Sequence, residues 1–369
     1  MKVVHLTTVH SAFDTRIFHK EAKTLQRAGH QVTLIAPQVK PQIIDGVKMV
    51  GLPKVRTRWE RIFALAWYAF RQAIQQRAEV YHFHDPELLP VGVLLKRRTG
   101  AKVVYDVHED VPEQMLSKDW IPSLLRRPLA WLFHRWEKWA AGRLDAVVVA
   151  TEGIAQKFPA HQPIVVHNFP DLRMWPNFPR RDLQSRARMI VYAGGISRQR
   201  GAVEMVQAME YLKFSGPVWL KLIGKFEPLE LCQQLQSLPG YQRVQHLGWL
   251  APERVYEHLR EADVGLVCLH PEPRYMVAWP VKLFEYMAAG LPVVVSDFPL
   301  WRQIVEGSGC GLCVNPLRPM EIAQAVDRLL SDPAEAQRMG QHGRQAVEQK
   351  YHWDLEAKKL LHLYETLQP

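Results

Sequence analysis

A single acidic side chain stands near the start of a predicted helix that runs directly into an apolar strand. The stretch is KLFEYMAAGLPVVV, residues 282–295: Gly290 ends the helix, Pro292 prevents its continuation, and the β-branched run that follows indicates a buried strand. We expect Glu285 in the first turn of this helix, where it can face a ligand-binding crevice rather than the core. The alternative role for Glu285 is a favourable interaction with the positive end of the helix dipole.

A glycine pair and two arginines follow another predicted strand, in YAGGISRQRG, residues 192–201. Gly194 and Gly195 would let backbone amides approach a phosphate group, and the next helix would offer its positive N-terminal end. Arg198 and Arg200 add forked donors that suit a diphosphate. Because glycines and arginines share many ordinary turns, the alternative for Arg200 is a surface-exposed charge.

Two histidine motifs close predicted strands in the first half of the chain, YHFHDP at residues 81–86 and YDVHED at residues 105–110. His108 could hydrogen-bond a hydroxyl group or handle a proton near neutral pH. For His84, packing in the core or beside a helix cap is nearly as good an interpretation, because Asp85-Pro86 is typical of an N-cap followed by proline at the first helical position.

The loop after the first predicted strand, residues 8–16, carries His10, Asp14 and Arg16. Asp14 can cap a helix that continues to Ala28 and ends at Gly29. Arg16 could equally be a solvated charge of the first helical turn. We therefore predict only that this loop borders a cleft.

Strand and helix patterns alternate through both halves of the chain, which predicts parallel sheets built from βαβ units. A loop rich in proline and aromatic residues, Asn168–Arg181, is predicted to link a domain over residues 1–170 to one over residues 171–354. The 369 residues, 47% hydrophobic, suffice for two cores of ordinary size. The predicted strands are Val3–Thr7, Gln31–Ala36, Val80–Phe83, Lys102–Asp106, Ala146–Ala150, Pro163–His167, Met189–Ala193, Val218–Ile223, Val244–Leu247, Val264–Cys268 and Val293–Ser296.

In this order, these motifs resemble those of the family 4 glycosyltransferases, and in particular a subset involved in bacterial surface-polysaccharide synthesis. The matching stretches also include VHN at residues 166–168, LIG at 222–224 and HLGW at 246–249, so the resemblance covers most of the chain. It implies the GT-B fold, in which two doubly wound Rossmann-like domains face each other across a cleft. It also implies that a C-terminal helix, residues 355–369, can pack back on the first domain.

The resemblance assigns a role to each motif. Glu285 would hold the ribose of a nucleotide-sugar, Arg200 and Lys282 its diphosphate, and His108 the sugar or the acceptor. The remaining residues of the donor site would be Gly194, Gly195, Arg198, Gly224, Trp249, Leu250 and Leu283, and those of the acceptor side or cleft His10, Asp14, Arg16 and His84. Family 4 enzymes are retaining, which implies front-face attack with the departing diphosphate helping to take the acceptor proton.

The chain departs from the family pattern at four positions. Gly195 stands where arginine is usual and Arg200 where lysine is usual, so that Arg198 could supply the missing cation. Val277 replaces the first of two glutamates, the second being Glu285. Val281 replaces the asparagine of a Pro-Asn-Lys-Leu-Phe-Glu-Tyr-Met pattern, which affects sugar recognition more than nucleotide binding.

Charge is concentrated in the first half of the chain. Residues 1–170 hold 24 basic and 15 acidic side chains, a net of +9, against +1 for the remainder. This imbalance points to an anionic partner: a phosphorylated substrate, an acidic membrane surface or, ranked last because no such module is evident, nucleic acid. A polyprenyl-linked acceptor would lie at such a membrane surface.

Two basic and aromatic segments could contact that membrane. For Arg56–Arg77 we favour packing of the rings into the core, whereas Ser117–Arg143 fits a core helix and a membrane-surface helix equally well. The aromatic residues are Trp59, Phe63, Trp67, Tyr68 and Phe70 in the first segment and Trp120, Trp131, Phe133, Trp136 and Trp139 in the second.

Several other chemistries find no support in the sequence. Without an Asp-x-Asp motif, a metal-diphosphate clamp is not expected, and arginine, lysine and helix amides would neutralise the leaving group. We expect no metal or cofactor besides the nucleotide-sugar. The Cys310/Cys313 pair lacks partners for a zinc site and suits small packing residues in a reducing compartment. Neither a signal peptide nor a membrane span is evident, so a cytoplasmic or peripheral inner-membrane location is expected.

The sequence therefore predicts a metal-independent glycosyltransferase that moves a sugar from a nucleotide-diphosphate sugar to a hydroxyl of a glycan or lipid-linked acceptor. Two alternatives remain. A non-catalytic, membrane-associated scaffold would bind the nucleotide-sugar without turnover. A nucleotide-sugar epimerase of the same architecture would need no acceptor.

Overall fold

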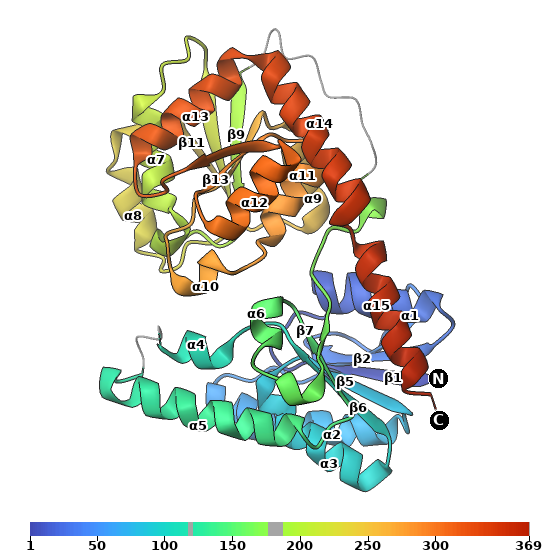
Figure 1. The fold of residues 1–369 in the computed structure, drawn as a ribbon. Helices are drawn as coiled ribbons and strands as arrows, with labels where there is room; N and C mark the ends of the chain where they lie inside the picture. Colours follow the sequence, from blue (N-terminus) through green and yellow to red (C-terminus); the bar gives the residue numbers. More distant parts are fainter. Residues whose placement is uncertain (117–120, 176–186, 369) are drawn as a thin grey trace. The chain divides into compact units, whose positions relative to one another are not determined.

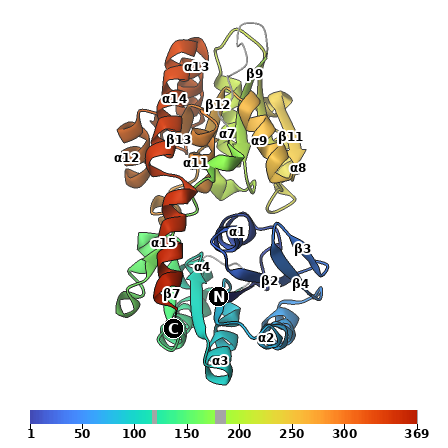
Figure 2. The same ribbon diagram turned by 90° about the vertical axis from the view of Figure 1, so that its right-hand side faces the viewer.

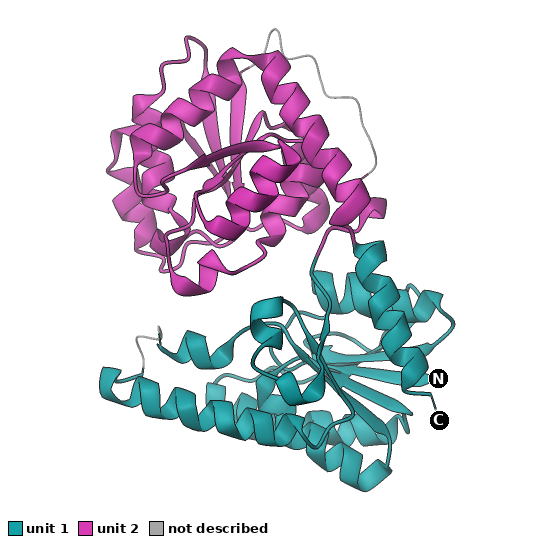
Figure 3. Ribbon diagram, in the orientation of Figure 1, with its two compact units in different colours: residues 1–168, 353–369 teal, residues 169–352 magenta. Residues whose placement is uncertain are grey.

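The computed structural model describes residues 1–116, 121–175 and 187–368. The chain divides into two compact units, which are described separately (Figure 3): unit 1 is Met1–Asn168 with Trp353–Pro369, and unit 2 is Phe169–His352. Residues 176–181 of the predicted linker lie outside the described residues, as do Lys118 and Trp120 of the second aromatic segment.

Unit 1 is built on an eight-stranded sheet in the order β3-β4-β2-β1-β5-β6-β7-β8. All neighbours are parallel except the β3/β4 hairpin. The order reverses at β1, which lies between β2 and β5, so the carboxyl ends of β1 and β5 flank the position where open parallel sheets bind ligands. The strands are β1 (Lys2–Leu6), β2 (Gln31–Pro37), β3 (Gln42–Ile44), β4 (Val47–Leu52), β5 (Val80–Phe83), β6 (Lys102–Val107), β7 (Ala146–Val149) and β8 (Ile164–Val165).

Helices cover both faces of this sheet, as the apolar runs of its strands require. Successive residues of β1 point to opposite faces: Val4 joins the core beneath α2 and α3, and Val3 joins the core beneath α15. Figures 1 and 2 show these helices on opposite sides of the sheet. The helices of unit 1 are a π-helical stretch, Thr15–Ala22, continued by α1 (Lys23–Arg27), then α2 (Ala66–Gln75), α3 (Leu89–Thr99), α4 (Val111–Leu116), α5 (Ser123–Ala141), α6 (Glu152–Ala155) and α15 (Trp353–Thr366).

The C-terminal helix α15 is tied to unit 1 by polar contacts as well as by apolar packing. Trp353 Nε1 donates to Thr24 Oγ1 (2.9 Å), and Glu356 Oε2 accepts from the His167 amide (2.9 Å). The Tyr364 hydroxyl lies 2.9 Å from Nδ1 of the buried His82. The last helix of the chain therefore completes the fold of its first unit.

Unit 2 has a six-stranded parallel sheet in the order β11-β10-β9-β12-β13-β14. Its order reverses between β9 and β12, so the loop after β9 lies at the ligand-binding edge. The strands are β9 (Arg188–Ala193), β10 (Val218–Ile223), β11 (Val244–Gly248), β12 (Val264–Val267), β13 (Val293–Ser296) and β14 (Gly311–Val314). The helices are α7 (Ala202–Tyr211), α8 (Leu231–Gln236), α9 (Pro252–Glu261), α10 (Pro273–Met276), α11 (Val281–Ala288), α12 (Pro299–Ser308), α13 (Pro319–Ser331) and α14 (Pro333–Lys350).

The predicted α/β architecture of two doubly wound, parallel-sheet domains is confirmed. Every predicted strand is present, although β8 has two residues instead of five. Three strands were not predicted: β3 and β4, joined by a turn at Asp45-Gly46 where both residues have positive φ, and the short β14.

The expectation that the rings of Arg56–Arg77 pack into the core is wrong for most of them. Trp59, Phe63, Trp67 and Tyr68 are exposed, and of the five rings in this segment Phe70 is the buried one. In α5, Trp131 and Trp139 are exposed as well. Along the described parts of the chain, no helix is both long enough and apolar enough to cross a bilayer.

One buried acid of α5 makes the stability of unit 1 depend on pH. Glu137 is 2% exposed and accepts a hydrogen bond from the Tyr105 hydroxyl (2.8 Å). Burial raises the pKa of Glu137 to about 7 from an ordinary value of 4.5. Between those values the folded chain holds more protons than the unfolded chain, so the contribution of Glu137 to stability falls as the pH rises.

We therefore expect Glu137→Gln to remove this loss. The measured quantity is the free energy of unfolding of the variant minus that of wild type. This difference should be about 2 kcal/mol more positive at pH 8 than at pH 5. Urea unfolding at the two pH values measures the difference, with the exposed Glu365→Gln in α15 as the control. An equal effect of Glu137→Gln at both pH values would contradict the assignment.

Candidate functional site

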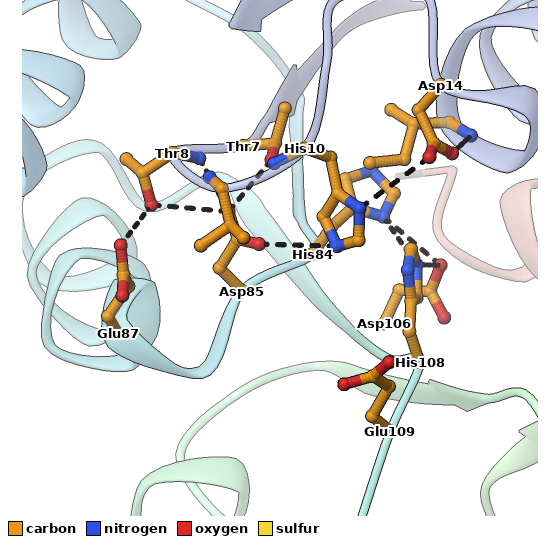
Figure 4. Close-up of polar contacts among 12 residues, drawn as sticks. Thr7, Thr8, His10, Asp14, His84, Asp85, Glu87, Asp106, His108 and Glu109 are labelled. Atoms are coloured by element: carbon orange, nitrogen blue, oxygen red, sulfur yellow. Dashed lines mark hydrogen bonds and ion pairs between the residues drawn. The ribbon is translucent and has the colours of Figure 1, made fainter. Parts of the chain in front are cut away.

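A polar cluster lies at the carboxyl edge of the unit 1 sheet, on the loops that follow β1, β5 and β6 (Figure 4). We call it the strand-end cluster and define it as His10, His84, Asp85, Asp106 and His108. Each member lies at the end of a strand or shortly after one. Since the carboxyl ends of parallel strands meet at one edge of the sheet, these residues come together there.

Asp106 is the centre of the strand-end cluster. One of its oxygens, Oδ2, lies 2.7 Å from His108 Nε2 and 3.2 Å from His84 Nδ1, and the two histidine nitrogens are 3.1 Å apart. Asp106 and His84 are buried, whereas the His108 side chain is 12% exposed. The cluster thus presents His108 outward on a buried carboxylate.

Arg16 holds Asp106 from the opposite side. Its Nε and Nη2 donate to the two oxygens of Asp106 (3.1 and 2.9 Å), and its Nη1 donates to the Val166 carbonyl (2.6 Å). Arg16 is only 3% exposed. The interpretation of Arg16 as a solvated charge is therefore wrong, and its guanidinium positions Asp106 from within the fold.

Burial and charge fix the protonation of His84 and Asp106. Burial lowers the pKa of His84 to about 4, although Asp106 works in the other direction. Burial alone would raise the pKa of Asp106, but Arg16 and then His108 hold it well below its ordinary value. Near neutral pH, a neutral His84 and an ionised Asp106 orient His108, which suits it to bind a hydroxyl or accept its proton.

His10 is the second member of the cluster that reaches the surface. Its ring lies 5.1 Å from that of His108, centroid to centroid. Its nitrogens lie 3.6 Å from Asp14 Oδ2 and 3.5 Å from Asp85 Oδ1. Burial by itself would lower the pKa of His10, but the hydrogen bond with Asp14 and the charge of Asp85 raise it.

The two acids beside His10 also shape the backbone. Asp14 caps the helical stretch as predicted, accepting from the amides of Arg16 and Ile17 (2.8 and 3.0 Å). Asp85 is the N-cap residue of the short helix that begins at Pro86, as predicted, but its carboxylate makes no capping hydrogen bond in the described structure. It accepts instead from the Thr8 amide (2.5 Å) and the Thr7 hydroxyl (2.9 Å), which joins the loops after β1 and β5.

Two members of the cluster also belong to a buried group whose ligand atoms lie within 4.8 Å of one another: Glu21, His82, His84 and Asp106. A cation of the protein is already present there, because Arg16 Nε lies 2.8 Å from Glu21 Oε1 as well as bonding to Asp106. We therefore interpret this group as a structural charge network centred on Arg16.

In unit 2, the glycine pair makes room for two cations. A methyl group on Gly195 would lie 2.3 Å from Arg200 Nη1, and one on Gly194 would lie 2.8 Å from Lys282 Nζ. Arg200 Nη1 donates to the Gly195 carbonyl (3.3 Å), as does the Tyr192 hydroxyl (2.7 Å). The loop after β9 therefore lets both cations approach its backbone.

Lys282 places a buried ammonium beside this loop. Its Nζ is inaccessible to solvent, and within the described residues no group accepts a hydrogen bond from it. It lies 3.8 Å from the centroid of the Tyr192 ring. Burial, and then the charge of Arg200, holds the pKa of Lys282 well below its ordinary value, while Glu285 works against both. A buried ammonium without a carboxylate partner is costly in the free protein and is suited to an anionic ligand.

Glu285 lies on the same side of α11 as Lys282, three residues later, and is partly exposed. We expected Glu285 in the first turn of this helix. The helix begins at Val281, however, so Glu285 falls in its second turn. Since the effect of the helix dipole fades beyond the first turn, that alternative explanation of Glu285 is weakened. Leu283 packs its side chain into the core of unit 2.

The other predicted donor-site residues divide by exposure. Gly224 has φ of +151°, and a methyl group there would lie 1.9 Å from the Gly194 carbonyl, so glycine is needed where the loops after β9 and β10 meet. Trp249 is 67% exposed in the turn after β11, and Leu250 is partly buried beside it. Arg198 is exposed, so the cation that approaches the glycine pair is Arg200.

Some residues of both sites were not predicted. In unit 1 the central Asp106 was missed; a charged residue inside the apolar strand KVVYDV was the available signal. In unit 2, Glu227 and Tyr275 lie near Arg200 and raise its pKa, although burial alone would lower it. Glu227 lies in the loop after β10 and Tyr275 in α10, both distant in sequence from Arg200, and no pattern marks them.

Gly195 offers a direct test of the cradle around Arg200. We expect Gly195→Ala to displace the guanidinium and weaken nucleotide diphosphate binding by about tenfold, the effect of losing one charge-assisted hydrogen bond. Calorimetric titration measures the affinity. Gly307→Ala is the control, because its added methyl group meets open space. Unchanged affinity in Gly195→Ala would show that Arg200 does not bind the ligand.

Two family models match this chain in succession. The model described as "Glycosyl transferase 4-like domain" matches residues 15–168, and the one described as "Glycosyl transferases group 1" matches residues 174–346. The first match includes every member of the strand-end cluster except His10, and the second includes the donor-side residues from Gly194 to Glu285.

Proteins that are similar along most of the chain agree with these two family matches. The chain is 24% identical to the MMP alpha-(1->4)-mannosyltransferase of Mycolicibacterium hassiacum, over 86% of this chain and 79% of that one. It is 23% identical to the phosphatidyl-myo-inositol mannosyltransferase of Mycolicibacterium smegmatis, over 94% and 88%. Among solved structures, HepE of Anabaena in complex with UDP-glucose shares the fold, with a TM-score of 0.72 at 16% identity, covering 99% of this chain and 100% of that one.

Proposed function

Since this chain belongs to the family 4 glycosyltransferases of the GT-B fold, and is a glycosyltransferase of that type, we propose that it moves a sugar from a nucleotide-diphosphate sugar to a hydroxyl of a glycan or lipid-linked acceptor. The reaction breaks the bond between the sugar's anomeric carbon and the diphosphate oxygen and forms one to the acceptor oxygen. The acceptor proton passes to the departing diphosphate.

The observation that carries this proposal is the buried ammonium of Lys282 beside Gly194, which has no hydrogen-bond acceptor among the residues that the structure describes, together with Arg200 on Gly195. Two cations that converge on a glycine loop at the end of β9 form a site for two phosphate groups. A diphosphate would supply the negative charge that Lys282 lacks. HepE, which shares the fold, is complexed with UDP-glucose, and this favours a nucleotide-sugar as the donor.

The remaining donor contacts follow from position. Glu285, on the same side of α11 as Lys282, would hold the ribose hydroxyls. Trp249, exposed after β11, and Leu250 would line the nucleotide pocket together with the backbone at Gly224. Leu283 would contribute to the position of α11 through the core rather than through contact with the donor.

We infer that the leaving group is neutralised without a metal ion. Lys282 and Arg200 supply the positive charge that would otherwise come from a divalent cation, and donors placed before the reaction lower the energy of the charge that develops. In a retaining reaction the departing diphosphate takes the acceptor proton on the same face. His108, oriented by Asp106, would hydrogen-bond the sugar or the acceptor hydroxyl.

The acceptor that unit 1 suits best is a glycolipid at an anionic membrane surface. The net charge of +9 over residues 1–170 and the exposed rings of Trp59, Trp67 and Trp131 favour peripheral attachment. The similar protein from Mycolicibacterium smegmatis is a phosphatidyl-myo-inositol mannosyltransferase, and a lipid acceptor fits this comparison. We place the reaction in the synthesis of a cell-surface polysaccharide.

A nucleotide-release assay tests the proposal. The chain is incubated with UDP-, GDP-, ADP- and dTDP-sugars in the presence of a chelator, with and without polyprenyl-diphosphate-linked sugar. We expect one nucleotide to be released, only when acceptor is present, and the product to keep the anomeric configuration of the donor. Release without acceptor, a strict requirement for a divalent ion, or no release from any donor would each contradict part of the proposal.

A further inference from the structure

Unit 1 contains an apolar cavity of about 660 Å³ that the mechanism above does not use. It lies between four helices: the N-terminal end of α2, and α3, α4 and α5. Its walls are almost entirely hydrocarbon. Among the lining side chains are Phe63, Trp67, Leu94, Met115, Phe133 and Trp136. The volume is in the range of cavities that hold small organic ligands.

A short series of contacts joins this cavity to the strand-end cluster. Glu87 lines the cavity and accepts a hydrogen bond from the Thr8 hydroxyl (2.7 Å), and the Thr8 amide donates to Asp85 (2.5 Å). Asp85 in turn lies 3.5 Å from His10, whose ring neighbours that of His108. The loops after β5 and β6 therefore carry the cluster at their start and the cavity wall a few residues later.

Little in the cavity could bind a polar ligand. Glu87 is already engaged, because Arg61 Nε donates to both of its oxygens (2.9 and 3.1 Å) in addition to the bond from Thr8. Gln114 is the other polar side chain of the wall, and it too has a partner, Glu109. A sugar or a base would leave its own polar groups unpaired in such a site, whereas a hydrocarbon chain would not.

The surface around the cavity combines exposed aromatic and basic side chains. Trp59, Phe63 and Trp67 are exposed on the α2 side, and Trp131 on α5. The same helices carry the cations Arg71, Arg127 and Arg135, in a half of the chain with net charge +9. This combination suits the headgroup region of an anionic membrane and complements an anionic amphiphile.

We propose that the cavity holds the hydrocarbon chain of the lipid-linked acceptor, so that its anionic headgroup and sugar lie at the strand-end cluster. The inference rests on the proposed function and names its substrate class: an acceptor anchored by an aliphatic chain, bound by unit 1 through that chain. The cavity then selects lipid-linked over free glycans.

Binding of a series of alkyl phosphates to the full chain tests the inference. Inorganic phosphate, hexyl phosphate and decyl phosphate are titrated by calorimetry below their micelle concentrations. Each methylene that enters the cavity is expected to strengthen binding by about fourfold, so decyl phosphate, with four more methylenes, should bind about 250-fold more tightly than hexyl phosphate. Equal affinities for hexyl and decyl phosphate would overturn the inference.

A pair of tryptophan substitutions separates the cavity from the surface. Ala66 lines the cavity, and Ala64, two residues earlier, is exposed and does not. Ala66→Trp should abolish the dependence on chain length, and Ala64→Trp should keep it. Leu94→Trp, from the opposite wall, replaces Ala66→Trp if thermal unfolding shows that the latter does not fold. Equal effects of the cavity and surface substitutions would show that the alkyl chain adsorbs elsewhere.

Nucleotide titrations on the same variants separate this inference from the proposed function. If the donor nucleotide binds to all variants but no chain-length dependence exists, the cavity inference alone fails. If chain-length dependence is found but no nucleotide binds, the lipid site stands and the transferase proposal fails. A last outcome concerns binding to phosphatidylglycerol vesicles. If Ala66→Trp and wild type bind the vesicles equally, and alkyl phosphates show no chain-length dependence, the protein attaches to membranes only by its surface and the inference is overturned.

Discussion

Replacing Lys282 with methionine is expected to lower kcat/KM by at least about 100-fold while making the protein more stable. The ammonium is buried beside the glycine loop without a hydrogen-bond acceptor among the described residues, so in the free protein it is a cost. Its contact with the Tyr192 ring offsets only part of that cost. Methionine keeps the unbranched shape and most of the length of the side chain, ending one atom earlier, and removes the charge that would bind the diphosphate.

The two effects of Lys282→Met have opposite signs, and this makes the test specific. Urea unfolding should show an increase of about 1–3 kcal/mol in the free energy of unfolding, the gain expected when a buried charge becomes a well-packed apolar group. Steady-state kinetics measures the loss of activity. Lys213→Met, at an exposed site of unit 2, should change neither quantity. A variant that loses stability and activity together would indicate a structural lysine.

Replacing Asp106 with asparagine is expected to destabilise unit 1 by about 3–5 kcal/mol. The substitution leaves Arg16 buried with less than its full compensation, and removing one partner of a buried ion pair has effects of this size. It also removes the charge that orients His108, so activity should fall in the folded fraction as well.

Asp45→Asn provides the matched control for Asp106→Asn. Asp45 pairs with Lys23 at 2.7 Å, but its side chain is 54% exposed, and exposed pairs contribute about 0–1 kcal/mol. Asparagine also tolerates the positive φ of this position. Urea unfolding monitored by circular dichroism compares the two variants. If they destabilise the protein equally, the interpretation of Arg16 and Asp106 as a buried network is wrong.

The sequence predicted those parts of the fold that depend on apolar runs bounded by turn residues. VTLIA and VVYDV could be recognised as buried strands because nearly every residue is apolar, as parallel strands covered on both faces require. The β3/β4 hairpin was missed because β3 is an exposed edge strand with no such run. Its Asp45-Gly46 turn, a hairpin signal, was nevertheless present.

Sequence position alone does not tell which side of a helix faces water. The rings of Arg56–Arg77 follow a helical pattern and were assigned to the core, but the core side of α2 is made of Ala66, Ala69, Phe70 and Ala73. The three alanines let the helix pack closely, and the four rings other than Phe70 remain outside. An amphipathic pattern therefore does not distinguish a core-facing aromatic stripe from an exposed one.

The strand-end rule located both candidate sites but not the buried ion pair at the centre of the unit 1 site. His84, His108 and the glycine pair were found because polar groups that follow parallel strands gather at one edge. Asp106 was passed over because it belongs to a strand. Arg16 was assigned to the cleft, but its burial against Asp106 was not predicted, because a first-turn arginine is usually solvated. Their pairing at 2.9 Å joins residues 90 positions apart, and no local pattern reveals such a contact.

Calorimetric titration of nucleoside diphosphates and monophosphates, in the absence of metal, tests the central claim most directly. UDP, GDP, ADP and dTDP are compared with their monophosphates on wild type and on Lys282→Met. If Lys282 and Arg200 form the diphosphate site, one diphosphate will bind more tightly than its monophosphate, and the difference will be largely lost in Lys282→Met. Equal binding of diphosphate and monophosphate in wild type, or no binding of any nucleotide, would contradict the claim.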